Sequence, residues 1–215
     1  DTLAAPITLS QGEYRATMSI GIALFPRDGT TAEDLTRHAD IAMYQVKRSG
    51  KNAFRFFDPT LNAHHHERIT LENDLRNALL RGEFELHYQP QVSVARRQIV
   101  GMEALLRWRH PVLGALSPNT FIQVAEELGM IGEISRWVME EACTQLAQWR
   151  SAGHLELRMS VNLSPLDFDK RDIVSSITEC LARHALPPGQ IELEITESLM
   201  MNDTADVATK VRELR

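Results

Sequence analysis

The chain contains 215 residues, of which 43% are hydrophobic and 24% are charged. This composition is typical of globular protein, so a disordered chain is not expected. The formal net charge of −6 gives no basic surface for nucleic acid, so no nucleic-acid partner is expected and an anionic ligand must be held by a local cluster. No apolar run approaches the roughly 20 residues that span a bilayer. We therefore expect these domains to be cytoplasmic, and a membrane anchor upstream of them remains an open alternative.

The first predicted segment covers residues 1–57. A β-rich run over residues 14–25 predicts a strand, and Pro26 and Gly29 indicate the turn after it. Thr31 is a suitable N-cap for a helix that continues until Gly50, because apolar residues recur there at helical spacing. A short apolar strand over residues 53–57 is predicted to end the segment.

A charged helix is predicted from Asp58, an N-cap residue followed by Pro59, to about residue 81. We interpret residues 58–82 as a helical connector between two domains.

Neither the run of three histidines nor the pair of cysteines has the spacing of a metal site. His64, His65 and His66 are consecutive, so on a helix their side chains point in three directions and cannot converge on one ion. Cys143 and Cys180 lie far apart in the sequence, in different predicted helices. We expect both cysteines to be buried small hydrophobic residues.

Strands and helices alternate from Glu83 onward, which is typical of an α/β architecture with mostly parallel strands. Strands are predicted near residues 84–94, 98–107, 156–164 and 190–196, and helices near 118–129, 132–152, 169–185 and from 203. The first two strands are close enough in sequence to pair antiparallel, whereas the later ones are separated by crossover helices. The predicted fold class is α/β, with residues 83–215 forming half of a (β/α)8 TIM-like barrel.

Two of the predicted strands carry polar residues on one face and apolar residues on the other. Successive strand residues alternate in direction, so Ser160 and Asn162 share a face, as do Glu192 and Glu194. Polar residues inside a barrel would mark a functional site, but periodicity leaves open whether they face water instead.

Glu103 lies among apolar neighbours, where an unpaired carboxylate would be costly to bury. An ion pair with Arg107 and a bound cation would explain this carboxylate equally well. Glu103, Asn162 and Glu194 together form a set of oxygen ligands that suits Mg²⁺ or Mn²⁺ and the chemistry of phosphate esters. His87 and His110 are expected to be hydrogen-bonded neighbours of the strands, and Glu126 and Glu127 to form a solvated helix face.

Four motifs resemble, in order and spacing, those of the EAL family of cyclic-di-GMP phosphodiesterases. They are Tyr88-Gln89-Pro90, Glu103-Ala104-Leu105 with Arg107-Trp108, Asn162-Leu163-Ser164 and Glu194-Ile195-Thr196-Glu197. The resemblance implies that Glu103, Asn162 and Glu194 are metal ligands. It implies that Glu197 holds the adjoining loop at the catalytic site, and that Gln89 and Arg107 contact the dinucleotide.

The N-terminal segment resembles the last part of a diguanylate-cyclase (GGDEF) domain, of α+β fold. Three stretches carry this resemblance, over residues 19–23, 39–44 and 47–52. It implies triphosphate contacts for Lys47 and Lys51, although two exposed lysines near a helix C-terminus explain the pattern at least as well. The Gly-Gly-Asp-Glu-Phe segment itself is absent, so cyclase chemistry is not assigned to these residues.

The resemblance implies an enzyme that hydrolyses cyclic di-GMP, a bacterial second messenger, to pGpG with metal-activated water. The family also has an aspartate pair, a lysine, a glutamate and a glutamine that would follow Arg215. We therefore expect this activity from a longer parent protein and not from residues 1–215 alone. The alternatives are a receptor that binds cyclic di-GMP without cutting it, and a cyclase-like segment that only senses GTP or dimerises. A homodimer is expected from the resemblance alone.

Overall fold

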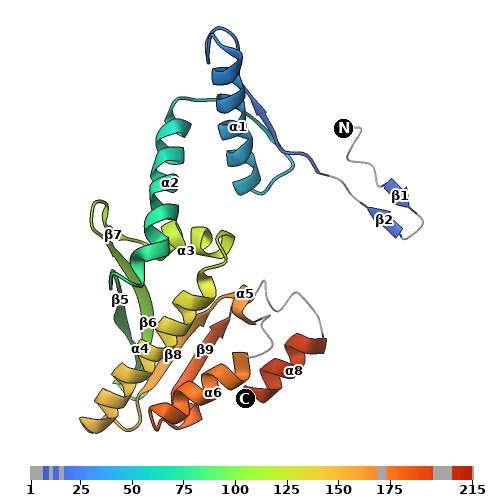
Figure 1. Ribbon diagram of the computed structural model, residues 1–215. Coiled ribbons are helices and arrows are strands. Elements are labelled where there is room, and N and C mark those ends of the chain that lie inside the picture. The colour runs from blue at the N-terminus through green and yellow to red at the C-terminus, as the bar shows by residue number, and fades with distance from the viewer. Residues whose placement is uncertain (1–6, 10–11, 15–16, 169–172, 196–204, 215) are drawn as a thin grey trace. The chain divides into compact units, whose positions relative to one another are not determined.

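The computed structural model describes residues 7–9, 12–14, 17–168, 173–195 and 205–214. The chain divides into two compact units, Asp1–Thr70 and Leu71–Arg215, and each is described by itself. Helix α2 (Thr60–Ala78) begins in the first unit and continues into the second (Figure 1). Its first residues follow Asp58, whose carboxylate accepts hydrogen bonds from the backbone N–H and the hydroxyl of Thr60.

The first unit contains a hairpin and a β-α-β arrangement. Strands β1 (Ile7–Leu9) and β2 (Gly12–Tyr14) are antiparallel. Strands β3 (Ile20–Ile22) and β4 (Phe54–Phe56) are parallel and are connected through helix α1 (Ala32–Arg48). The strand predicted over residues 14–25 is therefore too long, because its first residue belongs to the hairpin and a turn begins at Phe25.

Close packing holds α1 against β3. Thr31 caps the helix as predicted, because its Oγ1 accepts a hydrogen bond of 3.1 Å from the Asp34 N–H. A Cβ atom on Gly21 would lie 1.9 Å from the Ala39 carbonyl oxygen, so only glycine allows the helix and the strand to approach this closely.

The second unit is built on one mixed sheet. Its strands are β5 (Phe84–Ser93), β6 (Gln98–His110), β7 (Gly114–Leu116), β8 (Arg158–Leu163) and β9 (Ile191–Ile195). They are ordered β5-β6-β8-β9, and β7 pairs with β6. The β5–β6 pair is antiparallel, whereas β6–β8 and β8–β9 are parallel. The predicted α/β class is confirmed, and the described strands form an open arc of a barrel-like sheet.

The helices of the second unit lie along the sheet (Figure 1). They are α3 (Pro118–Glu127), α4 (Ile131–Ser151), α5 (Pro165–Phe168), α6 (Ile173–Arg183) and α8 (Ala205–Glu213), with a 3₁₀ turn at Pro188–Gln190. The predicted helix over residues 169–185 corresponds to α6, and residues 169–172 lie outside the described residues. Among the helices that the structure describes, none combines the length and the apolar composition that a membrane span requires.

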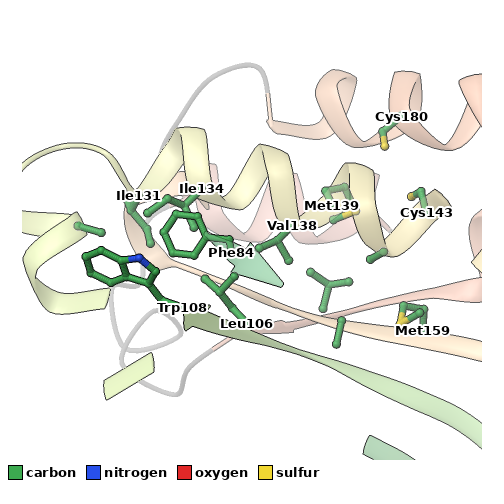
Figure 2. Packing of buried hydrophobic residues seen from close by; sticks show 14 of the residues in the cluster. Phe84, Leu106, Trp108, Ile131, Ile134, Val138, Met139, Cys143, Met159 and Cys180 are labelled. Carbon is green, nitrogen blue, oxygen red and sulfur yellow. The ribbon is translucent and has the colours of Figure 1, made fainter. Parts of the chain in front are cut away.

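One face of the sheet forms the hydrophobic core with α3, α4 and α6 (Figure 2). Met159 and Val161 on β8 are buried on this face, and Phe84 and Trp108 pack there against Phe121 of α3. The Trp108 indole N–H donates a hydrogen bond of 2.9 Å to Glu83, which satisfies the one polar group of this buried side chain.

The short strand β7 was missing from the sequence prediction. His110, which is buried, organises the turn before it: the ring Nδ1 accepts hydrogen bonds from the backbone N–H groups of Val112 and Leu113. Because Nδ1 is an acceptor, the ring proton lies on Nε2, which donates to Asp74 at 3.0 Å. His110 is therefore a structural residue, as the sequence prediction stated.

Candidate functional site

The strand register places the polar residues of four strands on the sheet face opposite the hydrophobic core. Gln89 of β5 lies opposite Glu103 of β6, and Asn162 of β8 lies opposite Glu194 of β9. Their apolar neighbours in sequence, such as Val161, point to the helices. The polar stripes thus lie on the sheet face opposite the one that the helices cover.

Glu103 and Asn162 are in direct contact although 59 positions separate them in the sequence. The Asn162 Nδ2 donates a hydrogen bond of 3.0 Å to the Glu103 Oε1. The alternative ion pair between Glu103 and Arg107 does not form; instead, the Arg107 Nη1 donates to the Leu106 carbonyl oxygen at 2.8 Å. The reason is strand geometry, since residues four apart on a strand are separated by roughly 13 Å.

A second polar contact on the same face involves Ser160, the register partner of Glu103 on β8. The Gln91 Nε2 donates a hydrogen bond of 3.1 Å to the hydroxyl of Ser160, which is fully buried. Gln91 reaches from β5 to β8 by passing over Gly101 of β6, where a Cβ atom would lie 2.6 Å from the Gln91 Oε1. Glycine at position 101 therefore permits the hydrogen bond between Gln91 and Ser160, which connects β5 to β8, the strand that carries Asn162.

A cavity of about 500 Å³ opens beside Glu103 and Asn162, between the sheet and helices α3 and α4. Ser164, which follows β8, lines it and donates a hydrogen bond of 2.8 Å to Glu126 of α3. Glu126 is half-buried, so the predicted solvated face is wrong for this residue, whereas Glu127 is exposed. The Ser164–Glu126 bond joins α3 to the loop that carries on from Asn162.

The donor atoms of the predicted ligand set fit a hard divalent cation. Glu103 and Glu194 offer carboxylate oxygens and Asn162 offers an amide oxygen, the ligands that Mg²⁺ and Mn²⁺ prefer. The Asn162 amide presents its nitrogen to Glu103, and a half-turn of the amide presents its oxygen instead. The set has no sulfur or imidazole, so it does not suit zinc.

The remaining predicted site residues lie in different places. Gln89 is exposed on the polar face, and Arg107 is half-buried two layers above Glu103. Glu197 lies outside the described residues. Lys47 and Lys51 are exposed near the C-terminal end of α1 in the first unit.

The sequence prediction placed Ser160 on the polar face but missed the contacts that support the site. Gln91 and Ser160 carry no motif, and their contact depends on the register of β5 on β6 and on the missing side chain at Gly101. The one available signal was Gly101 inside a predicted strand, because such a glycine often marks a close approach. Glu126 gave no signal that distinguished it from Glu127.

Comparisons with known proteins identify both units. The sequence profile of the EAL domain matches residues 72–215, and that of the diguanylate cyclase, GGDEF domain, matches residues 1–53. The bifunctional diguanylate cyclase/cyclic di-GMP phosphodiesterase MucR of Pseudomonas aeruginosa is 43% identical over 211 residues, which cover 98% of this chain and 31% of MucR. The cyclic di-GMP phosphodiesterase NbdA of the same organism is 36% identical over 212 residues, covering 97% of this chain and 27% of NbdA.

Solved structures give the same result. The PaMucR phosphodiesterase in its c-di-GMP complex aligns with a TM-score of 0.66 and 41% identity, covering 67% of this chain and 59% of that chain. The chain spans about a third or less of the full length of the curated relatives MucR and NbdA.

Proposed function

Because the chain belongs to the EAL domain family and carries a GGDEF segment at residues 1–53, we propose that it is part of a phosphodiesterase that hydrolyses cyclic di-GMP to linear pGpG. The observation that supports this proposal is that three oxygen-bearing side chains come from neighbouring strands on one face of the sheet. Glu103 and Asn162 are 3.0 Å apart, and Asn162 lies in register with Glu194. The similarity to MucR and NbdA supports the choice of cyclic di-GMP as the substrate.

In this proposal Glu103, Asn162 and Glu194 hold Mg²⁺ or Mn²⁺. When bound, such an ion polarises a phosphoryl oxygen and lowers the pKa of its bound water, so that hydroxide forms near neutral pH. The buried Ser160 and its partner Gln91 keep β8 in place, and the Ser164–Glu126 hydrogen bond fixes the chain that leaves β8. Both contacts hold Asn162 in position to act as a ligand.

The dinucleotide would be held by side chains on the same face. Arg107 supplies a permanent positive charge for a phosphate, and among the residues that the structure describes its Nη1 donates to the Leu106 carbonyl oxygen. Gln89 is exposed beside Glu103 and can donate and accept hydrogen bonds with a phosphate or a guanine edge. Glu197 is proposed to hold the loop that follows β9.

The first segment supports a regulatory proposal. Residues 1–53 match the diguanylate cyclase, GGDEF domain, and we infer that a complete GGDEF domain would bind GTP and contribute to a homodimer. Lys47 and Lys51 are exposed and free to contact a triphosphate. GTP added to the full-length protein should change its hydrolysis rate or its oligomeric state, and no change in either would contradict this proposal.

The experiment that tests the enzymatic proposal is Glu103→Gln in the full-length protein. Glutamine keeps the size of the side chain and an oxygen that can accept from Asn162, but it removes the charge that a cation needs. We expect pGpG formation in Mg²⁺ to fall at least about 100-fold, while calorimetric binding of cyclic di-GMP changes only a few-fold. Glu133→Gln, an exposed residue in the first turn of α4, is the matched control and should cut normally.

Two results would contradict the proposal. Wild-type protein that binds cyclic di-GMP in Mg²⁺ and leaves it uncut would be a receptor, for which Gln89 and Arg107 would serve equally well. A Glu103→Gln variant that cuts at the wild-type rate would remove Glu103 from the ligand set.

A further inference from the structure

A second group of metal-binding side chains joins helices α4 and α6, away from the oxygen ligands of the sheet. Glu140 comes from α4, Cys180 comes from α6, and His184 is the residue that directly follows α6. The His184 Nε2 lies 2.7 Å from the Glu140 Oε1, and the Cys180 Sγ lies 3.3 Å from the Glu140 Oε2. One ligand atom from each residue lies within 4.8 Å of the other two.

The spacing at the C-terminal end of α6 brings two different ligands to one side. His184 is four residues after Cys180 and its backbone N–H donates to the Cys180 carbonyl oxygen at 3.3 Å, so it continues the last turn of α6 and lies on the same side as Cys180. In a tetrahedral zinc site, the bond lengths of roughly 2.0 Å for oxygen and nitrogen and 2.3 Å for sulfur place oxygen about 3.3 Å from nitrogen and about 3.5 Å from sulfur. The two observed distances run to different oxygens of Glu140, and each is within about 0.6 Å of these values. One oxygen, one ring nitrogen and the sulfur lie within 4.8 Å of one another, so side-chain movements would bring a single oxygen to an ion shared by all three.

We propose that Glu140, Cys180 and His184 form a binding site for a zinc-type divalent cation. A thiolate, an imidazole and a carboxylate are the donors that zinc prefers, whereas Mg²⁺ takes oxygen ligands almost alone. The site is therefore chemically distinct from Glu103, Asn162 and Glu194, and it does not depend on the proposed hydrolysis of cyclic di-GMP.

The protein without zinc already contains a positive group at this position. The Arg183 guanidinium donates to the Glu140 Oε2 at 2.6 Å, and together with His184 it lowers the pKa of the Glu140 carboxyl to about 2. The carboxylate is thus ionised at every working pH. The Arg183 side chain is 56% exposed, so it can turn into water when a cation takes its place.

The thiol must lose its proton for zinc to bind. Burial raises the pKa of the Cys180 thiol, and the nearby Glu140 carboxylate raises it further, so the sulfur carries its proton in the zinc-free protein. Binding forms a zinc–sulfur bond and releases that proton to solvent. Affinity for zinc should therefore increase as the pH rises.

Cys143 of α4 lies beside this group but is not one of the proposed ligands. It is fully buried, and its sulfur faces Cys180 across the two helices (Figure 2). Burial raises the pKa of the Cys143 thiol strongly, and contact with Cys180 raises it further. Cys143 therefore provides a control of the same residue type, next to the site and inaccessible to solvent.

A bound ion would connect the two helices that cover the parallel strands. α4 packs on β8, and α6 packs on α4 and on the core residues of the sheet. Since β8 and β9 carry Asn162 and Glu194, zinc at this position would stiffen the support of the proposed catalytic face without touching it.

The test is titration of the purified full-length protein with Co²⁺, which substitutes for zinc and reports its ligands in the absorption spectrum. We expect an ultraviolet charge-transfer band from a cobalt–thiolate bond together with intense visible bands of four-coordinate Co²⁺. Zn²⁺ should remove both bands by displacement, and Mg²⁺ should not. Absence of a thiolate band at saturating Co²⁺ would overturn the proposal.

Variants assign the ligands. Cys180→Ser should abolish the thiolate band, and His184→Gln and Glu140→Gln should each weaken zinc binding more than about 100-fold. Arg183→Gln should tighten binding, because it removes the competing cation. Cys143→Ser and Glu103→Gln should keep the band, with affinity within about tenfold of the wild type. Loss of the band in Cys143→Ser and not in Cys180→Ser would overturn the assignment, and circular dichroism of each variant shows whether it is folded.

Discussion

Substitution of Gly101 by alanine tests how the sheet supports the proposed ligands. A Cβ atom at this position would lie 2.6 Å from the Gln91 Oε1 and 3.3 Å from the Arg158 carbonyl oxygen. The Gln91 side chain is flexible and would move away, which would break its hydrogen bond to Ser160. The hydroxyl of Ser160 is fully buried and would then have lost its donor.

The expected cost follows from these contacts. A buried polar group without its partner costs about 1–3 kcal/mol, and alanine recovers about 0.4–1 kcal/mol by restricting the unfolded chain. The free energy of unfolding should therefore fall by about 1–2 kcal/mol. Urea unfolding followed by tryptophan fluorescence measures this change in the second unit, because Trp108, Trp137 and Trp149 all belong to it.

A double-mutant cycle isolates the contact. In a Ser160→Ala background the hydroxyl is already absent, so Gly101→Ala should cost at least about 1 kcal/mol less than it does in the wild type. Equal costs in the two backgrounds would refute the role given to Gln91, and so would an increase in stability with Gly101→Ala alone.

Three further predictions concern other parts of the chain. Phe121→Ala should lower the free energy of unfolding by about 3–5 kcal/mol in urea, because the ring is fully buried against the sheet; a loss below about 1 kcal/mol would contradict the packing. Gly21→Ala should cost about 3 kcal/mol or more and speed proteolysis of the first unit, because its Cβ would lie 1.9 Å from the Ala39 oxygen; an unchanged cleavage rate would contradict that contact. The folded-state pKa of Glu140, about 2, is below its ordinary 4.5, so in metal-free protein its ion pairs stabilise the fold above pH 4.5 and this contribution is lost as the pH falls through about 2. In Glu140→Gln the free energy of unfolding should change with pH by about 1 kcal/mol less than in the wild type. This value is small because the Glu140 side chain is 41% exposed and water screens its ion pairs. Identical plots of unfolding free energy against pH for the wild type and the variant would contradict the prediction.

Local patterns predicted most of the elements of the second unit. The strands around Glu103, Asn162 and Glu194 fall where alternation placed them, and the antiparallel and parallel pairings are confirmed. These predictions succeeded because hydrophobic period and connection length determine strand position and direction. The α/β fold class follows from the same two properties.

The contacts that depend on tertiary packing could not be predicted in this way. The pairing of Gln91 with Ser160 requires the strand register, and the cluster of Glu140, Cys180 and His184 requires the packing of α6 on α4. Cys143 and Cys180 are buried, as expected, but their meeting across two helices left no trace in the sequence. The sequence also could not show whether the polar stripes face the helices or the opposite side of the sheet, because this depends on which face the helices cover.

The most direct test of the central claim is the hydrolysis of cyclic di-GMP by the purified full-length protein, with its mass confirmed, in Mg²⁺ and in a chelator. We predict that pGpG accumulates in Mg²⁺, that chelation stops it, and that Mg²⁺ or Mn²⁺ restores it. Cyclic di-GMP that is bound at saturation but remains intact in both Mg²⁺ and Mn²⁺ would contradict the assignment of Glu103, Asn162 and Glu194 to a catalytic metal site.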